Sequence, residues 1–407
     1  MFDALEAAPP DAIFGLTEAF RQDPRNDKLN LGVGVYKDPE GTTPIFAAVR
    51  EAERLLLVSE STKSYLPMEG SARYAARIRE LLLGQGELLD SGRAVTLQAP
   101  GGTGALRVAA ELVQRVAPGT TAWVSKPTWP NHPQVFEAAR VPLREYRYFD
   151  RAALGLDFEA MLEDLAQARA GDLVVIHGCC HNPTGADLDV AQWTRLAELL
   201  AERGLVPLVD FAYQGFARGL REDAAWLTIL AQRLPELMVA SSLSKNFGLY
   251  NERVGALTVI TPSAERSAVV LSQLKRTVRA IYSNPPAHGA LVAAEILESP
   301  ELTELWRQEL DGMRERIHHL RRQFADGLSR RDARLHPDGN EFLVEQNGMF
   351  SFSGLGPDSV QWLRQEHGIY IVGSGRINVA GIRETAIDAL CDAVAEALRA
   401  APAAVGG

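Results

Sequence analysis

Short apolar runs alternate along the chain with segments whose apolar residues recur every three or four positions. The runs cover residues 122–124, 173–176, 206–209, 237–240 and 254–260. Between two of them, Trp193, Leu196 and Leu200 follow a helical spacing. Short apolar runs are typical of strands buried on both faces, and intervening helices supply the crossovers of a parallel sheet. We therefore expect an α/β fold with a mostly parallel sheet covered by helices.

The C-terminal third has longer helical patterns. Between residues 300 and 331 the apolar positions are spaced alternately by four and three, at Trp306, Leu310, Met313, Ile317, Leu320 and Phe324. A coiled coil would fit, but the repeat covers only about three heptads, so we favour one long helix that links a large domain to a smaller one. A last helix over 384–399 has one apolar face, which we expect to pack on the sheet of the smaller domain.

Length and charge restrict the kind of protein. A chain of 407 residues exceeds what one core usually serves, which predicts two domains. The net charge of −10 disfavours nucleic acid and anionic membranes as partners. No segment approaches about 18 consecutive apolar residues, and the first residues lack the pattern of a secretion signal. Cys179, Cys180 and Cys391 form no disulfide framework, so we expect reduced thiols and a cytoplasmic location.

Lys245 stands out because it follows a predicted strand and two hydroxyl side chains. The sequence from Ser242 to Gly248 comes directly after the run 237–240, and ligands of α/β sheets collect at the carboxyl ends of strands. Ser244 and Arg253, eight residues after the lysine, add donors suited to a phosphate. The alternative is a polar turn with a solvated lysine. We take Lys245 as the candidate covalent anchor of a cofactor.

Two other predicted strands end in polar side chains. Asp210 closes an apolar run, and Tyr213 follows three residues later. A carboxylate that is partly removed from water needs a cation, which a protonated pyridine nitrogen would supply. After the run 173–176, the Asn-Pro and Thr-Gly pairs within 177–185 predict a turn that holds Asn182.

Residues 100–104, Pro-Gly-Gly-Thr-Gly, open the helical pattern 105–116. Glycines at a helix start let backbone N–H groups approach an anion. The segment lacks both the dinucleotide fingerprint and the lysine of a P-loop, so alone it is weak support for an anion site.

His177, Cys179, Cys180 and His181 invite a zinc interpretation, which we reject. Adjacent cysteines at a strand end point to opposite faces, and no second ligand pair follows at the spacing of a zinc motif. We expect no metal.

In this order along the chain, the segments 30–36, 65–70, 177–185, 242–255 and 373–381 resemble the fold-type I, class I aminotransferases that use pyridoxal phosphate. The bacterial aspartate and aromatic amino acid aminotransferases are the closest match, and the resemblance runs essentially end to end. It implies a large cofactor-binding domain over 43–312 and a small domain over 313–407. Residues 1–42 would supply an arm that wraps a partner subunit and part of the small domain.

The resemblance also implies roles at the cofactor. Lys245 would hold pyridoxal phosphate covalently and carry the proton, for which its amine must be neutral. Asp210 would pair with the pyridinium nitrogen, and Tyr213 and Asn182 would hydrogen-bond the ring's 3-oxygen. Trp129 would stack on the ring, although a core aromatic is its alternative. The phosphate ligands would be Gly102, Thr103, Ser242, Ser244, Arg253 and the neighbouring subunit's Tyr65. His132 either lies beside the cofactor or has a structural role, and the sequence does not decide between the two.

The resemblance also implies that two arginines determine which substrates bind. Arg376 would clamp the α-carboxylate, with Asn182, Trp129 and the backbone of Gly34 beside it. Arg279 would cross the interface of a homodimer to bind a distal carboxylate, although arginines in basic stretches are usually solvated.

The implied function is a ping-pong aminotransferase that passes an amino group to 2-oxoglutarate. Val35, Lys37, Thr43, Thr103 and Asn284 match the aspartate-preferring branch, whereas Ser64 and residues 65–70 look more like the aromatic branch. We favour L-aspartate with side activity on phenylalanine and tyrosine, and an aromatic amino acid aminotransferase is the alternative. Another reaction of the same cofactor, such as elimination or decarboxylation, is disfavoured because the paired arginines suit dicarboxylic substrates. A non-catalytic regulatory domain would need a DNA-reading module, for which the segment before residue 30 leaves no room.

Overall fold

The computed structural model describes residues 2, 5–7 and 12–400. The chain divides into two compact units. The larger unit consists of Pro44–Asp150 and Gly155–Arg316. The described residues among Met1–Thr43, Arg151–Leu154 and Ile317–Gly407 form the smaller unit.

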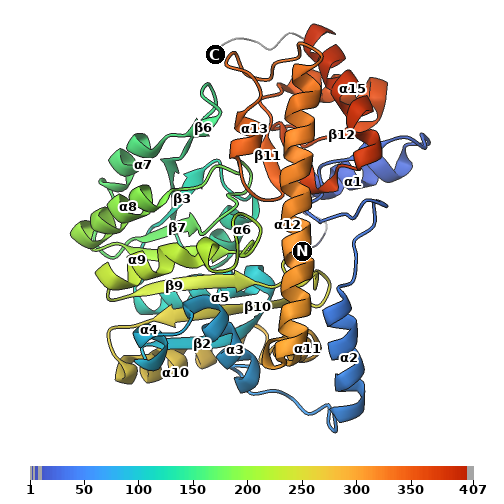
Figure 1. The fold of residues 1–407 in the computed structure, drawn as a ribbon. Coiled ribbons are helices and arrows are strands. Elements are labelled where there is room, and N and C mark those ends of the chain that lie inside the picture. The colour runs from blue at the N-terminus through green and yellow to red at the C-terminus, as the bar shows by residue number, and fades with distance from the viewer. Residues whose placement is uncertain (1, 3–4, 8–11, 401–407) are drawn as a thin grey trace. The chain divides into compact units, whose positions relative to one another are not determined.

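A seven-stranded sheet forms the centre of the larger unit (Figure 1). Its order is β2 (Ala94–Pro100), β10 (Val254–Ile260), β9 (Leu237–Ser242), β8 (Val206–Phe211), β7 (Leu173–His177), β3 (Ala122–Lys126) and β4 (Leu143–Arg147). Only β10 runs against its neighbours, so the predicted mostly parallel sheet is confirmed. Because β10 is antiparallel, its first residue lies at the edge where the other strands end, with Val254 opposite Pro100.

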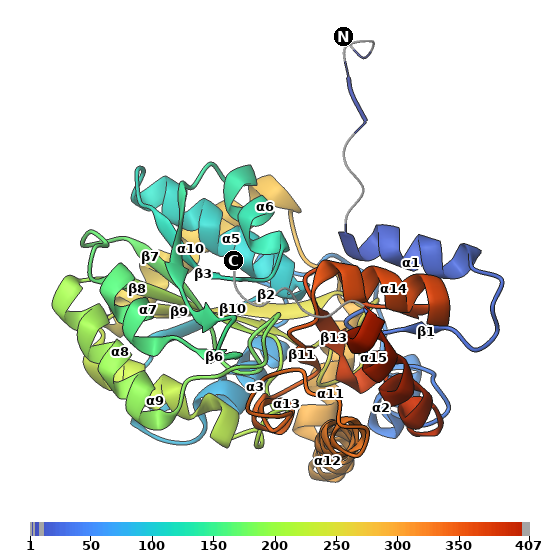
Figure 2. The same ribbon diagram turned by 90° about the horizontal axis from the view of Figure 1, so that it is seen from above.

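Helices cover both faces of this sheet (Figure 2). One side carries α5 (Gly101–Val116), α6 (Asn131–Ala138) and α10 (Ala264–Ile281), and the other carries α3 (Ala72–Leu83), α8 (Val190–Arg203) and α9 (Ala225–Arg233). Cover on both faces explains why the central strands β7, β8 and β9 are nearly continuous apolar runs. The fully buried core side chains include Leu97, Leu106, Phe136, Ala240, Leu257 and Leu274.

Local signals fix the ends of the helices. For example, α8 begins at a capping box between Asp189 and Gln192 and ends at Gly204, whose φ is 64°. The remaining elements of the larger unit are α2 (Ala47–Ser59), α4 (Glu87–Asp90), β5 (Phe149–Asp150), β6 (Gly155–Leu156), α7 (Phe158–Leu165), η2 (Glu222–Ala224) and α11 (His288–Glu298).

The long helix predicted after residue 300 is α12 (Pro300–Ser329), a single helix of 30 residues (Figure 1). Its first part belongs to the larger unit and the part from Ile317 onward to the smaller one. The apolar stripe is buried along its whole length, at Trp306, Leu310, Met313, Ile317, Leu320 and Phe324.

The smaller unit has no single sheet among its described residues. Instead it has two ladders of two strands each, β1 (Leu29–Asn30) with β12 (Ile369–Tyr370) and β11 (Phe350–Phe352) with β13 (Arg376–Asn378). Its other elements are α1 (Ala12–Gln22), α13 (Phe342–Glu345), α14 (Pro357–His367), η3 (Val379–Gly381), η4 (Glu384–Ala386) and α15 (Ile387–Ala400). The helix predicted over 384–399 thus consists of the 3-10 turn η4 followed by α15.

The core of the smaller unit joins distant parts of the chain. Leu31 packs in one cluster with Phe324, Ile377 and Leu390, so residues near the N-terminus complete a core built by the C-terminal third. No helix among the described residues has both the length and the apolar character needed to cross a membrane.

Candidate active site

The polar side chains predicted to act together leave the large sheet at one edge. The parallel strands β7, β8 and β9 end at His177, Phe211 and Ser242. The loops after these ends contain Asn182, Tyr213 and Lys245, and the buried Asp210 lies in β8 one residue before its end. The carboxyl edge of an α/β sheet is where ligands bind, so the fold gathers these residues at a site of the expected kind.

The amine of Lys245 interacts with Tyr213, Asp210 and Arg253. Its Nζ is 4.8 Å from the centre of the Tyr213 ring. Burial lowers the pKa of Lys245 to about 8, and Arg253 adds to this effect while the carboxylate of Asp210 opposes it. A lysine with this pKa is substantially neutral near pH 8, and a neutral amine can attack a carbonyl or accept a proton.

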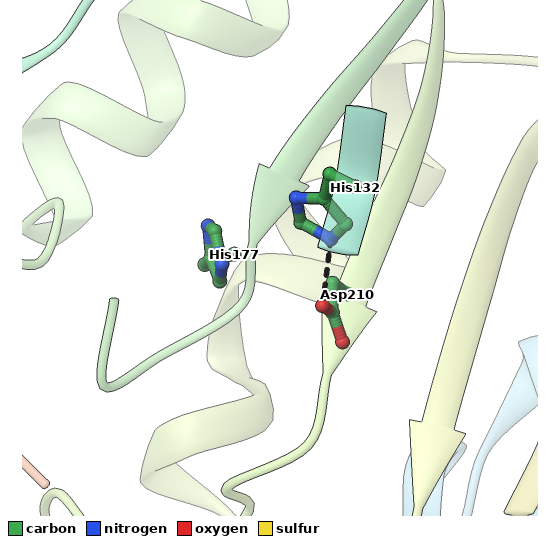
Figure 3. Close-up of side chains that lie close together, drawn as sticks. All are labelled: His132, His177 and Asp210. Carbon is green, nitrogen blue, oxygen red and sulfur yellow. Dashed lines mark hydrogen bonds and ion pairs between the residues drawn. The ribbon is translucent and has the colours of Figure 1, made fainter. Parts of the chain in front are cut away.

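Asp210 is buried and paired with a histidine that the sequence left undecided (Figure 3). His132 Nε2 lies 2.9 Å from Asp210 Oδ2. Burial raises the pKa of Asp210, but the hydrogen bond from His132, helped by the charge of Lys245, outweighs it and lowers the pKa overall. The carboxylate therefore stays ionised and can hold a cationic partner at the edge of the sheet.

His177 completes a close trio with His132 and Asp210 (Figure 3). Burial lowers the pKa of His177 to about 3, so its ring is neutral. Neither of its ring nitrogens has a hydrogen-bond partner among the described residues. The ring nitrogens of His177 are therefore buried polar atoms to which a bound molecule or a water molecule can hydrogen-bond.

The trio is poorly arranged for a metal. His132 uses Nε2 for Asp210 and Nδ1 for the hydroxyl of Thr128, at 2.8 Å, so both of its nitrogens are engaged. His181, considered above for zinc, is engaged in the same way by Ser125 and Thr184, at 2.9 and 2.7 Å. A metal ligand needs a free lone pair, and hydrogen bonds occupy the nitrogens of both histidines here.

An anion cradle lies beside the lysine. Gly101, with φ of 74°, opens α5, and a Cβ added there would lie 2.5 Å from Nη2 of Arg253. A Cβ on Gly102 would lie 3.1 Å from the Cβ of Ser242. The hydroxyl of Ser242 donates to that of Ser244 at 3.2 Å.

The side chains that surround this helix start suit an oxyanion. The glycines leave the first backbone N–H groups of α5 open, next to a guanidinium and two hydroxyls. Thr103 sits in the same first turn. The cradle therefore fits the phosphate group for which its residues were predicted.

The other predicted residues of the larger unit are more exposed. Trp129 is partly buried and meets His132 edge to face, with ring centres 5.4 Å apart. Tyr65 is 93% exposed. Arg279 is exposed on α10, where Nη1 donates to the Ser283 hydroxyl at 2.5 Å.

Arg279 faces a shallow depression of about 730 Å³ that is rich in cations, lined also by Arg115, Lys275 and Arg276. A depression with this lining attracts carboxylates.

Arg376 and Gly34 belong to the smaller unit. Arg376 is buried, donates from Nη2 to the Gly32 carbonyl at 2.5 Å and lies 4.3 Å from the centre of the Phe350 ring. A Cβ added at Gly34 would lie 2.7 Å from the same ring. The guanidinium is thus fixed between the 32–34 segment and an aromatic face, which restricts its direction.

The sequence interpretation missed the pairing of His132 with Asp210 and the role of Gly101 beside Arg253. The first joins residues 78 positions apart, so no local pattern signals it. The second had a signal in the glycine run 100–104, but the family resemblance named Gly102, and nothing in the sequence shows that the antiparallel β10 brings Arg253 to Gly101.

Comparisons with known proteins agree with this geometry. The family model described as aminotransferase class I and II matches residues 26–394. The chain is 51% identical to an aspartate aminotransferase of Salmonella typhi, covering 98% of this chain and all of the relative. It is 48% identical to an aromatic-amino-acid aminotransferase of Pseudomonas aeruginosa, over 97% of this chain and 98% of the relative.

Among solved structures, an aromatic-amino-acid aminotransferase from Burkholderia pseudomallei covalently bound to pyridoxal phosphate has a TM-score of 0.95 and 44% identity. The match covers 98% of this chain and 99% of that protein.

Proposed function

This chain belongs to the aminotransferase class I and II family, and we propose that it moves the amino group of L-aspartate to 2-oxoglutarate with pyridoxal phosphate as cofactor. The observation that carries the proposal is the arrangement around Lys245. A buried amine, a buried carboxylate and an anion cradle lie together where the sheet ends. These three features match the aldehyde, the pyridine nitrogen and the phosphate of one molecule.

The residues present fit this cofactor. Lys245 would hold it, Asp210 would pair with its ring nitrogen, and Trp129 would cover the ring. Its phosphate would be bound by Gly102, Thr103, Ser242, Ser244 and Arg253, with Tyr65 of a second subunit. When bound, the cofactor supplies an aldehyde that accepts the amino group and a ring that accepts electrons from the substrate's α-carbon.

Lys245 is also the proposed proton carrier. Because burial lowers its pKa to about 8, its amine can accept the proton from the substrate's α-carbon near neutral pH. Tyr213, with its ring against Nζ, and Asn182, buried after β7, would hydrogen-bond the cofactor's ring oxygen. The Asp210–His132 pair would keep a negative charge beside the ring nitrogen without itself moving a proton.

Arg376 is the proposed ligand of the substrate's α-carboxylate, with the backbone of Gly34 and the side chains of Asn182 and Trp129 beside it. The support is that Arg376 is held in one direction by Gly32 and Phe350. Arg279 would bind the distal carboxylate in the active site of a second subunit. Its exposure within a cationic depression supports this role, as does the exposure of Tyr65.

We therefore propose a homodimer with shared active sites, in which residues 1–42 supply an arm and part of the small domain. The cofactor domain would cover 43–312 and the small domain 313–407, and the two compact units support this division. A cytoplasmic location is consistent with cysteines that are buried thiols.

Aspartate is proposed as the preferred amino donor, with side activity on aromatic amino acids. The match of Lys37, Thr43 and Asn284 to the aspartate-preferring branch supports this preference, and backbone carbonyls hold two of these side chains in place. Thr43 donates to the Tyr36 carbonyl at 3.0 Å, and Asn284 donates to the Leu66 carbonyl at 3.1 Å. An aromatic preference is the second candidate, favoured by Ser64 and residues 65–70.

The test is kcat/KM for L-aspartate and L-phenylalanine with 2-oxoglutarate as acceptor. A ratio well above one supports the proposal, and a ratio at or below one assigns the aromatic specificity. Double-reciprocal plots should be parallel at several 2-oxoglutarate concentrations, as a ping-pong reaction requires.

A further inference from the structure

Asp223 is a buried carboxylate that binds the backbone of the loop after β8. Its Oδ2 accepts hydrogen bonds from the N–H groups of Gly215 and Ala217, at 2.8 and 3.0 Å. Its Oδ1 accepts from Arg218 and Gly219, at 2.8 and 3.4 Å. Four backbone donors of one loop thus converge on a single side chain that is only 4% exposed.

These contacts replace the hydrogen bonds that a strand or helix would supply. Residues 212–219 lie outside regular secondary structure, so their N–H groups need other acceptors. Burial raises the pKa of Asp223, while the four N–H groups act against that rise. An aspartate is costly to bury, and the four N–H groups compensate that cost while fixing the path of the loop.

The loop that Asp223 holds contacts Lys245 and the next residue, Asn246. Tyr213 lies at its start, its carbonyl accepts from Phe216 N–H at 3.0 Å, and its ring lies 4.8 Å from Lys245 Nζ. The next residue, Gln214, accepts through its carbonyl from the amide of Asn246 at 3.2 Å, beside the lysine in sequence. A displacement of the loop would therefore move the phenol relative to the amine.

We propose that Asp223 is a positioning residue that fixes the phenol of Tyr213 opposite Lys245. The inference rests on the proposed function, in which Tyr213 hydrogen-bonds the cofactor's ring oxygen. Asp223 contacts backbone groups of the loop. It affects the reaction by fixing the position of the Tyr213 phenol.

The substitution Asp223→Asn keeps the shape of the side chain but replaces one acceptor oxygen by an NH₂ group, which faces two N–H donors. The expected result appears in the holoenzyme's visible absorbance, whose pH midpoint reports the protonation of the nitrogen that joins Lys245 to the cofactor. A phenol that donates to the anionic ring oxygen stabilises the unprotonated form. A misplaced phenol should therefore raise the midpoint by about one pH unit. The value of kcat should fall about tenfold.

Asp172→Asn is the matched control. Asp172 is also buried and accepts from Thr121 N–H at 3.0 Å, Arg169 N–H at 3.0 Å and Trp123 Nε1–H at 3.1 Å. It directly precedes β7, so it lies at the opposite edge of the sheet from Lys245. A general loss of stability should be similar in the two variants, whereas the spectral midpoint should move only in Asp223→Asn.

Tyr213→Phe separates this inference from the proposed function. If that variant leaves the midpoint unchanged, the proposed role of Tyr213 fails, and the inference fails with it. If Tyr213→Phe raises the midpoint and Asp223→Asn does not, the inference alone is overturned. In the double variant the midpoint should equal that of Tyr213→Phe, and fully additive shifts would contradict an action through Tyr213.

Hydrogen exchange in the unmodified holoenzyme covers the case in which Asp223→Asn does not fold. The amides of Gly215 and residues 217–219 should be strongly protected although they lie outside helices and strands. Exchange at the rates of an open loop would overturn the proposal.

Discussion

Nε2 of His132, at the start of α6, lies 2.9 Å from Oδ2 of Asp210, in β8, and both side chains are buried. The contact lowers the pKa of a carboxylate that burial alone would raise. Residues 78 positions apart thus maintain a negative charge at the carboxyl edge of the sheet, where the proposed function requires a partner for a pyridinium nitrogen.

His132→Ala should weaken catalysis without abolishing it. Loss of the hydrogen bond raises the pKa of Asp210 and weakens its hold on the ring nitrogen, so kcat/KM for aspartate should fall at least about tenfold. His319→Ala, at an exposed position of α12, is the control and should keep normal activity. Equal activity of the two variants would mean that the His132–Asp210 contact has no part in the reaction.

The rate of cofactor capture by the cofactor-free protein should depend on pH through Lys245. The folded pKa is about 8, below the usual 10.5, so the amine is mostly protonated below pH 8 and mostly neutral above it. The rate constant measured by stopped-flow absorbance should rise up to about tenfold per pH unit below pH 8 and then level off. A rate that keeps rising toward pH 10 would show that the amine has an ordinary pKa.

Gly101→Ala should weaken cofactor binding. A methyl group at this position would lie 2.5 Å from the Arg253 guanidinium, on a backbone whose φ of 74° already disfavours a side chain. We expect the dissociation constant for pyridoxal phosphate to rise at least about tenfold. Gly312→Ala is the control, because an added Cβ there meets no described atom within 4 Å, and its affinity should be unchanged.

Arg279→Ala should discriminate between substrates. Only aspartate loses a charge-assisted pair, so kcat/KM for aspartate should fall at least about 30-fold and that for phenylalanine much less. Arg266→Ala removes an exposed guanidinium at the start of α10, outside the cationic depression, and should affect both substrates little. Equal losses for both substrates in Arg279→Ala would remove the distal-carboxylate role.

The sequence predicted the parts of this site that follow directly from single strands. The apolar runs before Asp210 and Lys245 gave their strands correctly, and a mostly parallel sheet then implied that both residues lie at one edge. The direction of β10 could not be predicted, because an apolar run looks the same in either orientation, yet this direction brings Arg253 to the cradle.

Other features depended on contacts between distant residues. The pairing of His132 with Asp210 and the four N–H groups around Asp223 arise only when the chain has folded. The strands of the smaller unit are two or three residues long, which is too short for an alternating pattern to indicate them, and so one sheet was expected where there are two ladders.

The proposed function depends most directly on which residue holds the cofactor. Borohydride reduces the carbon–nitrogen double bond that an amine forms with the aldehyde of pyridoxal phosphate to a stable single bond, and peptide mass mapping then locates the label. We expect one labelled peptide, with the cofactor's mass on Lys245, and no label at that peptide in Lys245→Ala. A label on another lysine of the unmodified protein, or none at all in protein loaded with the cofactor, would contradict the proposed role of Lys245.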